Sequence, residues 1–339
     1  MHWAEENGPD QTRLIIEREK VAFETLTFWE DIGKAESIGI AGHIRPDGDC
    51  VGSALGLAAY IRDNYGKDPE VFLEDVPVAF SFLEGADKVV TGYPFREPFD
   101  LFIAVDCGDE GRLGKAMNYV RTAKKTYCID HHATSNGFME NNLVIPDSAA
   151  TAQIIYTLCD DSRITKGCAE ALYLGIVHDT GVFKHSCTTR ETMEIAGALL
   201  DHGVSSARII DGTFYEKTYL QNQILGRCLM ESILCLDGKV IFSAIDKKTI
   251  NLYGLGPADT EGIIDQLRVT KGVEVAILIR ELTPHSWRVS MRSCETVDVA
   301  KICSMFGGGG HVRAAGATMS GSRRDVINNL TAEIEKQLV

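Results

Sequence analysis

The sequence lacks the features of a secreted or membrane-spanning protein. None of its ten cysteines forms a CxxC pair, which argues against a zinc ribbon or a disulfide framework and favours reduced thiols. The opening segment MHWAEENGPDQTR carries acids and no apolar core, unlike a signal peptide. No apolar run approaches the roughly 18 residues of a membrane span. We therefore expect a cytoplasmic protein that does not contact a membrane.

Basic residues are scarce as well. The chain has 34 Lys and Arg against 48 Asp and Glu, a formal net charge of -14. Binding to long nucleic acid depends on neutralising its phosphates, so this chain is poorly suited to long duplexes. A small anionic substrate remains possible where metal ions or a few arginines attract it. The 339 residues, 45% of them hydrophobic, allow about two domains with sizeable cores.

The N-terminal half has the pattern of an α/β domain. Short apolar segments with polar ends alternate with helical periodicity, which predicts a mostly parallel sheet flanked by helices. We expect strands within 37–43, 69–75, 100–108, 125–132 and 141–147, and helices near 11–34, 52–64, 148–160 and 167–178.

A long helical region then leads to a second, smaller α/β domain. We predict a catalytic domain at 1–188, a helical linker at 189–230 and a substrate-binding domain at 231–339. In the last domain the expected strands are 239–246, 273–281 and 286–293, with helices near 259–268, 298–305 and 322–337.

Residues of metal-ligand type follow several of these elements. In an open α/β sheet, ligands collect beyond the carboxyl ends of the strands. The segment HIRPDGD follows the first expected strand, and further aspartates and histidines follow later strands and the helical segment ALYLGIV. The candidate ligands are His43, Asp47, Asp49, Asp106, His131 and Asp179.

This donor set suits a pair of divalent cations. Four carboxylates and two imidazoles favour Mn²⁺, with Mg²⁺ as the alternative, over a structural zinc ion. Without cations, converging carboxylates disfavour one another's ionisation. Gly48 would let Asp47 and Asp49 address different ions, and Pro46 would fix the entry of the loop.

Each feature alone also has a purely structural explanation. Pro, Asp and Gly form turns, so HIRPDGD could be a solvated loop. Asp106 could cap a helix, and Asp179 could simply end one. One histidine of the segment IDHH could be structural. The combination of all these features favours the metal site.

A glycine run marks the second domain. Four successive glycines are costly to order, but they let backbone amides approach an anion closely. An arginine on a preceding strand favours phosphate, which guanidinium binds through two hydrogen bonds. A flexible hinge is the alternative. The candidate substrate-binding residues are Arg292, Gly307, Gly308, Gly309, Gly310 and His311.

Together these segments resemble the DHH phosphoesterase superfamily, in the DHH/DHHA1 subfamily that includes nanoRNases and pAp phosphatases. The resemblance covers nearly the whole chain and rests on five ordered motifs: HIRPDGDCVGS, AVDCGDEGRLG, IDHHATSNGF, GIVHDTGVFKHSCTT and FGGGGHVRAAGA.

The resemblance implies roles for individual residues. One ion would be held by His43, Asp47 and Asp106, and the other by Asp49, Asp106, His131 and Asp179, with Asp106 bridging. His132 would contact the substrate phosphate without binding metal, and Asp130 would orient its histidine neighbours. Arg292, His311 and the glycine loop would hold the far end of the substrate. Cys50 and Cys107 would be packing residues.

The implied activity is two-metal hydrolysis of short RNA oligonucleotides to mononucleotides and of 3′-phosphoadenosine 5′-phosphate (pAp) to AMP. A cyclic-di-AMP or pApA phosphodiesterase is the close alternative, since the same motifs serve it. A pyrophosphatase and a processive single-strand exonuclease are disfavoured, the latter by the negative charge. A non-catalytic nucleotide-binding regulatory module is the alternative from another class, and the intact ligand set argues against it. A homodimer is compatible with the sequence.

Overall fold

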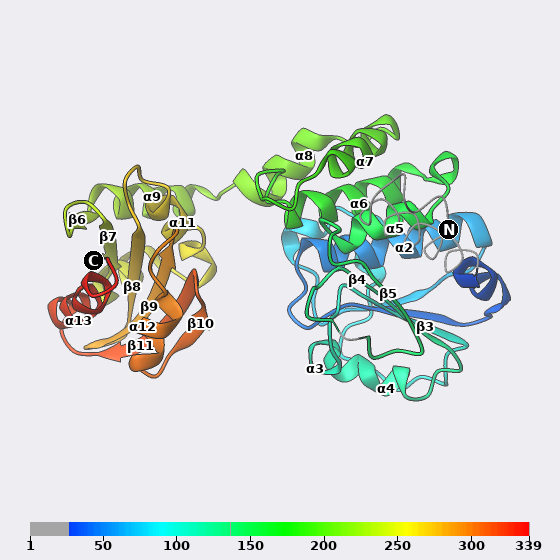
Figure 1. The fold of residues 1–339 in the computed structure, drawn as a ribbon, viewed down its shortest axis with the longest axis horizontal. Coiled ribbons are helices and arrows are strands. Elements are labelled where there is room, and N and C mark those ends of the chain that lie inside the picture. Colours follow the sequence, from blue (N-terminus) through cyan, green and yellow to red (C-terminus); the bar gives the residue numbers. More distant parts are fainter. Residues whose placement is uncertain (1–26, 136, 339) are drawn as a thin grey trace, which may run out of the picture. The chain divides into compact units, whose positions relative to one another are not determined.

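The chain divides into two compact units, Met1–Glu216 and Lys217–Val339 (Figure 1). This computed structural model describes residues 27–135 and 137–338. Of the helix expected at 11–34, residues 27–34 are helical, and the remainder lies outside the described residues. Phe28 and Ile32 from this helix are buried in the core of the first unit.

A five-stranded sheet with all strands parallel forms the centre of the first unit, in the order β2-β1-β3-β4-β5. This confirms the predicted α/β class and the parallel sheet. The strands are β1 (Ile38–Ala41), β2 (Glu70–Phe72), β3 (Leu101–Val105), β4 (Thr126–Asp130) and β5 (Asn141–Val144). The α-helices are α2 (Gly48–Tyr65), α3 (Glu110–Leu113), α4 (Met117–Val120), α5 (Thr151–Leu158), α6 (Lys166–Asp179), α7 (Arg190–Asp201) and α8 (Ser206–Ile210).

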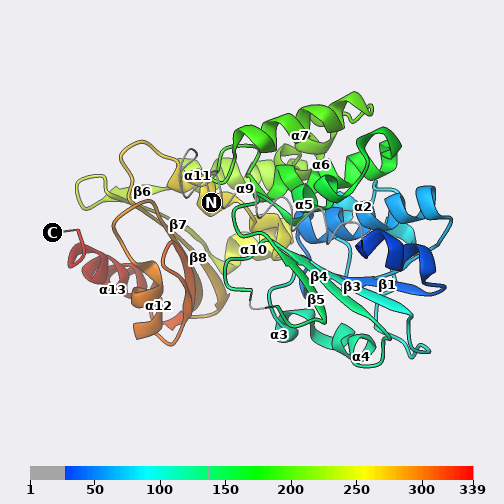
Figure 2. The ribbon, with the colours of Figure 1, turned by 45° about the vertical axis from the view of Figure 1, so that its right-hand side comes forward.

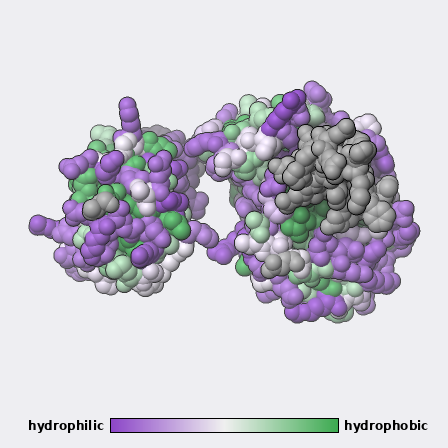
Figure 3. Space-filling view, in the orientation of Figure 1, coloured by the Kyte–Doolittle hydropathy of each residue, from purple (hydrophilic) through white to green (hydrophobic). Residues whose placement is uncertain are grey.

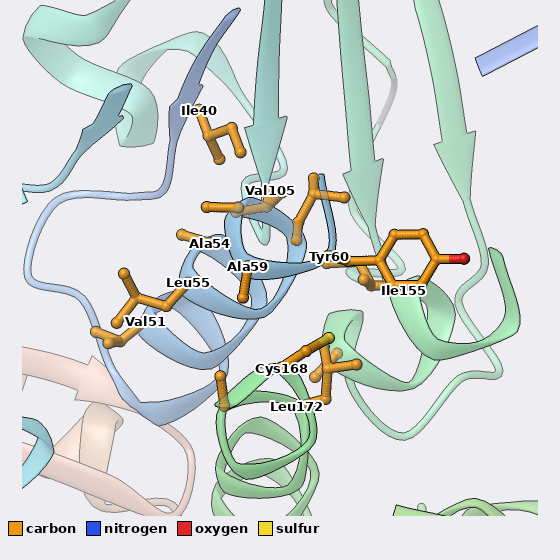
Figure 4. Packing of buried hydrophobic residues seen from close by; sticks show 14 of the residues in the cluster. Ile40, Val51, Ala54, Leu55, Ala59, Tyr60, Val105, Ile155, Cys168 and Leu172 are labelled. Carbon is orange, nitrogen blue, oxygen red and sulfur yellow. The ribbon is translucent and has the colours of Figure 1, made fainter. Parts of the chain in front are cut away.

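Both faces of this sheet are covered. Helices α2, α5 and α6 lie on one side and α3 and α4 on the other, as Figure 2 shows most clearly. Figure 4 shows Val105 of β3 on one side of α2, and Cys168 and Leu172 of α6 on the other. Because both faces of the sheet are covered, every residue of β3 and β4 is buried, and β3 is apolar throughout, as expected for an interior parallel strand.

The strand order indicates where a ligand-binding site is expected. From β1 the chain passes to β2 on one side of β1, and from β2 it returns to β3 on the other side. The strand order therefore reverses between β1 and β3. Ligands of open α/β sheets bind beyond the carboxyl ends of the strands at such a point. His43 follows β1 and Asp106 follows β3. The sheet therefore brings two distant segments to one edge.

The second unit contains a six-stranded mixed sheet in the order β10-β11-β9-β8-β7-β6. One face packs on α12 and α13, and the other on α9, α10 and α11. The strands are β6 (Ile233–Cys235), β7 (Val240–Ile245), β8 (Val275–Thr283), β9 (Ser286–Ser293), β10 (Gly309–His311) and β11 (Ala314–Ser320). The helices are α9 (Tyr219–Met230), α10 (Lys247–Tyr253), α11 (Ile263–Arg268), α12 (Val299–Met305) and α13 (Arg323–Glu335).

Two local expectations were wrong, and the structure adds detail to a third. Helix α2 starts at Gly48, not near 52, because Asp47 caps it. The glycine run is not only a loop, since Gly309 and Gly310 belong to the edge strand β10. The predicted helical region 189–230 consists of several segments: α7, α8, a π-helical turn at Asp211–Tyr215 and α9 follow one another. The boundary between the units falls after Glu216, within this region.

The surface is mainly hydrophilic on the face of each unit seen in Figure 3. Within residues 27–135 and 137–338, no helix has the length and apolar character needed to cross a bilayer.

Candidate metal centre

The start of α2 positions the first candidate ligands. The Asp47 carboxylate accepts hydrogen bonds through Oδ1 from the amides of Asp49 (3.2 Å) and Cys50 (3.1 Å), as an N-cap does. Its other oxygen, Oδ2, lies 3.6 Å from Nε2 of His43. The motif is thus both a helix start and part of a site, because one aspartate uses an oxygen for each purpose.

Asp49, in the first turn of α2, is completely buried. Its carboxylate accepts hydrogen bonds from the amides of Thr151 (2.6 Å) and Ala152 (2.9 Å), the first two residues of α5, and from the Ser53 hydroxyl (3.1 Å). The amides at a helix N-terminus favour an anion. These donors offset part of the cost of burying the charge and fix the orientation of the carboxylate.

Asp106 occupies the middle of the site. It is 2% exposed and has a left-handed backbone conformation, with φ of 54°. Its Oδ2 lies 3.4 Å from Nε2 of His43, and its Oδ1 lies 3.6 Å from Nε2 of His131. Oδ1 also accepts a hydrogen bond from the Thr151 hydroxyl. Asp106 does not cap a helix, since Asp109 caps α3. Its two oxygens face two different histidines.

His131 completes the second half of the site. It follows β4, and its Nε2 lies 2.9 Å from Oδ2 of Asp179, the last residue of α6, and 3.9 Å from Oδ2 of Asp49. All six predicted ligands are therefore linked by approaches of 2.9–3.9 Å, through Asp106 at the centre. Three overlapping groups with ligand atoms mutually within 4.8 Å lie here: His43, Cys50 and Asp106; Asp106, His131 and His132; Asp49, His131 and Asp179.

The tautomers of the two histidines fit a metal centre. Nδ1 of His43 lies 2.9 Å from the carbonyl oxygen of Ile44, and Nδ1 of His131 lies 3.2 Å from that of Ser148. A carbonyl oxygen can only accept, so Nδ1 carries the proton and Nε2 faces the carboxylates, the arrangement typical of metal-binding histidines. Nε2 of His43 is buried and makes no hydrogen bond to any described residue. A cation would satisfy this buried nitrogen.

When no cation is bound, the clustered carboxylates repel one another, and this repulsion affects their pKa values. Burial raises the pKa of Asp49 well above its usual value, and the neighbouring Asp106 and Asp179 raise it further. Burial, opposed by His131, also raises the pKa of Asp179. Asp47 differs: burial would raise its pKa, but His43 and the capping amides lower it to about 2. A cluster of this kind stabilises added positive charge.

Burial affects the two histidines in the opposite sense, but the neighbouring carboxylates raise their pKa values as well. Burial alone would lower the pKa of His43, but Asp106 and Asp47 raise it to about 10. Burial likewise opposes protonation of His131, while Asp179 and Asp49 raise its pKa to about 10. Each imidazole therefore holds a proton where a metal ion could bind instead, so the residues present fit a pair of divalent cations.

His132 has a different environment. Its Nδ1 lies 2.7 Å from Oδ1 of Asp130, which raises the pKa of the imidazole. Burial would raise the pKa of Asp130, but its contact with His132 lowers it. The His132 side chain is 30% exposed and the Asp130 side chain is fully buried. A buried carboxylate thus fixes the ring of an accessible histidine and leaves Nε2 free for another partner.

Two residues near the centre were not identified from the sequence. His178 packs on Gly48, where any β-carbon would lie 2.1 Å from the ring, and between Phe80 and Phe214. Burial lowers the pKa of His178 to about 4. Thr151 binds both Asp49 and Asp106. Nothing in the local sequence distinguishes either residue, because both roles depend on contacts with distant segments.

In the second unit, the sheet brings two of the predicted substrate-binding residues to one face. His311 on β10 pairs with Ala314 on β11, which pairs with Arg292 on β9. Directly paired residues project to the same face, so His311 and Arg292 lie two strands apart on one face. Their binding to substrate remains a prediction.

The glycines of this segment differ in what they contact. A β-carbon at Gly308 would lie 2.2 Å from the carbonyl oxygen of Gly316, and one at Gly310 would lie 2.4 Å from that of Ala314. Close packing on β11 therefore requires these two glycines. A β-carbon at Gly309 would meet nothing within 4 Å, so this position is open.

Arg288 is a further candidate for anion binding. Arg288 is exposed, and its guanidinium lies over Gly316. It precedes Arg292 by four residues on β9, so the two arginine side chains project to the same face of the sheet. The i, i+4 spacing of two arginines on an expected strand is the signal that could have identified it.

The comparisons with known proteins agree with this architecture. The model of the DHH family, N-terminal domain, matches residues 37–176, and that of the DHHA1 domain matches residues 237–339. The chain therefore belongs to the DHH/DHHA1 family of metal-dependent phosphoesterases, and it is a hydrolase of that class.

Individual relatives are similar over most of their length. The chain is 29% identical over 297 residues to the "Bifunctional oligoribonuclease and PAP phosphatase NrnA" of Thermus thermophilus, covering 83% of this chain and 84% of that protein. It is 26% identical to the protein of the same name from Bacillus subtilis, covering 82% and 87%. The crystal structure of an exopolyphosphatase-related protein from Bacteroides fragilis superposes with a TM-score of 0.81 at 22% identity, covering 92% and 95%, and shows the same fold.

Proposed function

We propose that this enzyme hydrolyses short oligoribonucleotides to mononucleotides and pAp to AMP, using two divalent cations, with Mn²⁺ preferred and Mg²⁺ as the alternative. The observation that carries this proposal is the position of Asp106, whose two oxygens face His43 and His131 at 3.4 and 3.6 Å. The names of the Thermus and Bacillus relatives support the choice of substrates.

The six predicted ligands would hold the cations in two groups that share Asp106. The first group is His43, Asp47 and Asp106, and the second is Asp49, Asp106, His131 and Asp179. Bound divalent cations supply positive charge that stabilises a phosphoryl group and lowers the pKa of water. The buried amides of α5 keep Asp49 oriented throughout.

His132 would act on the substrate, and Asp130 would position His132. The contact between Nδ1 and Oδ1, 2.7 Å, fixes the ring, so Nε2 can donate a hydrogen bond to a phosphoryl oxygen or a proton to the leaving group. Asp130 acts through His132 by stabilising its protonated form.

The second unit would select short substrates by binding their remaining phosphates and bases. Arg292 supplies a guanidinium and His311 an imidazole on one sheet face, and exposed Arg288 adds charge beside them.

A substrate panel tests the proposal. The full-length enzyme is incubated with Mn²⁺ and pAp, pApA, cyclic di-AMP or RNA of two to ten nucleotides, and products are separated by chromatography. We expect mononucleotides from the shortest RNAs and AMP from pAp, with no turnover in EDTA. Preferential cleavage of cyclic di-AMP would instead assign the alternative phosphodiesterase. Nucleotide binding without any turnover would assign a regulatory module and overturn the proposal.

A further inference from the structure

One thiol lies inside the candidate metal centre. Cys50 is in the first turn of α2 and is completely buried. Its Sγ, a ring nitrogen of His43 and a carboxylate oxygen of Asp106 lie within 4.8 Å of one another. Among the described residues, no other cysteine belongs to such a group. The donor set at this end of the centre is therefore not restricted to oxygen and nitrogen.

The thiol and the imidazole both have unused binding capacity. Sγ of Cys50 makes only a long contact, 3.9 Å, to the carbonyl oxygen of His43. Nε2 of His43, a residue that is 2% exposed, makes no hydrogen bond within the described part of the chain, although carboxylate oxygens of Asp106 and Asp47 lie 3.4 and 3.6 Å away. A buried polar atom without a partner is costly and needs an explanation. A shared cation would satisfy both groups.

The surrounding backbone makes room for the sulfur. A β-carbon at Gly42 would lie 2.1 Å from Sγ of Cys50. The absence of a side chain at this position, directly before His43, allows the thiol to lie beside the ligand loop. The alternative is that Cys50 is only one of the apolar side chains of the core cluster to which it also belongs.

We propose that Cys50 is a ligand of the cation held by His43 and Asp106, which makes this half of the centre selective for thiophilic divalent cations such as Zn²⁺ or Co²⁺ over Mg²⁺. On binding, the thiol proton passes to solvent buffer and the thiolate donates an electron pair to the cation. Soft thiolates favour such metals, whereas carboxylates suit Mg²⁺ and Mn²⁺. The proposal rests on the proposed function, since the centre is the same.

Cobalt spectroscopy tests the assignment independently of turnover. Metal-free full-length protein is titrated with Co²⁺, and the near-ultraviolet band that reports cobalt–thiolate bonding is recorded. We expect the band in the wild type and in C168S, whose buried thiol instead contacts the carbonyl oxygen of Gly56. C50S and C50A should lose it while still binding Co²⁺. Zn²⁺ affinity of C50S should fall by at least ~10-fold, and its Mn²⁺ affinity should fall less.

X-ray absorption of the wild type with Zn²⁺ provides a test that needs no variant. A sulfur scatterer at about 2.3 Å supports the assignment. Two bound ions with only oxygen and nitrogen neighbours would overturn the role of Cys50 and leave the proposed function intact. Loss of the cobalt band in C168S would also overturn it. Failure of the wild type to bind any divalent ion would overturn both the role of Cys50 and the proposed function.

Discussion

Replacing Asp106 by Asn tests the centre most directly. Asn retains the shape of the side chain and tolerates the left-handed backbone found here, with φ of 54°. It removes the negative charge and leaves one oxygen in place of two. Since Oδ1 and Oδ2 of Asp106 face different histidines, a single amide oxygen can serve at most one of the two ligand groups.

The expected loss of activity is large. Charge stabilisation by bound metal ions contributes several kcal/mol to the transition state. If about 4 kcal/mol of this is lost, turnover falls by about 10³-fold. The loss should be similar for pAp, RNA dinucleotides and a generic aryl phosphodiester, because Asp106 lies in the centre itself and not among the residues expected to choose the substrate.

Stability gives a second, independent readout. An ion at 100 times its dissociation constant stabilises the folded state by about 2.7 kcal/mol. The first unit, Met1–Glu216, falls in the size range where 1 kcal/mol shifts Tm by roughly 2–4 °C. Each ion should thus raise Tm of the wild type by about 5–10 °C. In the Asn variant most of this shift should disappear, which calorimetry with and without Mn²⁺ measures.

Metal-free stability should change little in this variant. The substituted Asn side chain keeps a polar group near the Thr151 hydroxyl, which in the wild type donates to Asp106 at 3.2 Å, while the repulsion between Asp106 and Asp49 is relieved. Replacement of the exposed Glu110 by Ala is the matched control and should preserve both activity and the Mn²⁺-dependent shift. Wild-type turnover in the Asp106 variant, or an unchanged shift, would refute the bridging position.

Three further outcomes follow from the structure. Gly175→Ala should cost about 1–3 kcal/mol of stability and reduce activity, because the new β-carbon would lie 2.7 Å from Oδ1 of Asp49. Gly197→Ala is the control, since a β-carbon there would meet nothing within 4 Å. Equal effects of the two substitutions would contradict this reasoning. Arg292→Ala should impair hydrolysis of short nucleotides far more than that of an aryl phosphodiester, and equal kcat/KM losses would mean that the arginine is structural. Binding of two Mn²⁺ at neutral pH should release at least two protons, because the raised pKa values of His43 and His131, about 10 each, keep both imidazoles protonated without metal. Calorimetry in buffers of different ionisation enthalpy counts the released protons, and release of none would contradict the fit.

The strands of the first unit could be predicted because their apolar segments are short and bounded by polar residues. The expected strand at 100–108 became β3, Leu101–Val105, and that at 125–132 became β4, Thr126–Asp130. The start of α2 was missed because Asp, Gly and Pro are common to turns and helix starts. Only the hydrogen bonds of Asp47 to two following amides distinguish these cases.

The second unit was harder to predict. Strand β11, Ala314–Ser320, is rich in Ala and Gly and has no hydrophobic alternation, so it was not separated from the glycine run. Its burial is explained only by pairing with β9, where Ala315 and Ala317 face Met291 and Val289. β10 lies so close to β11 that small residues are needed here. This tertiary contact cannot be predicted from the local sequence.

The contacts between the candidate metal-ligating residues likewise could not be predicted from the sequence. The residue types and their positions after strands indicated a site, but the division of donors depends on geometry. Asp47 shares its oxygens between a helix cap and His43, whereas Asp49 is held by the start of α5, about a hundred residues further along the chain. Cys50 shows the same limit, since its adjacency to Asp106 is not local in sequence.

Asp49 explains how the core and the centre depend on each other. Its carboxylate is buried where α2 packs closely on α6, with Gly175 leaving the space that it occupies. Its oxygens are already bonded to the amides of Thr151 and Ala152, so the start of α5 must stay in place for the carboxylate to face His131. Burying this charge beside Asp106 destabilises the metal-free fold. The extensive apolar core around α2 offsets that cost, and a bound cation removes it, because the positive charge neutralises the same carboxylates that the core forces together.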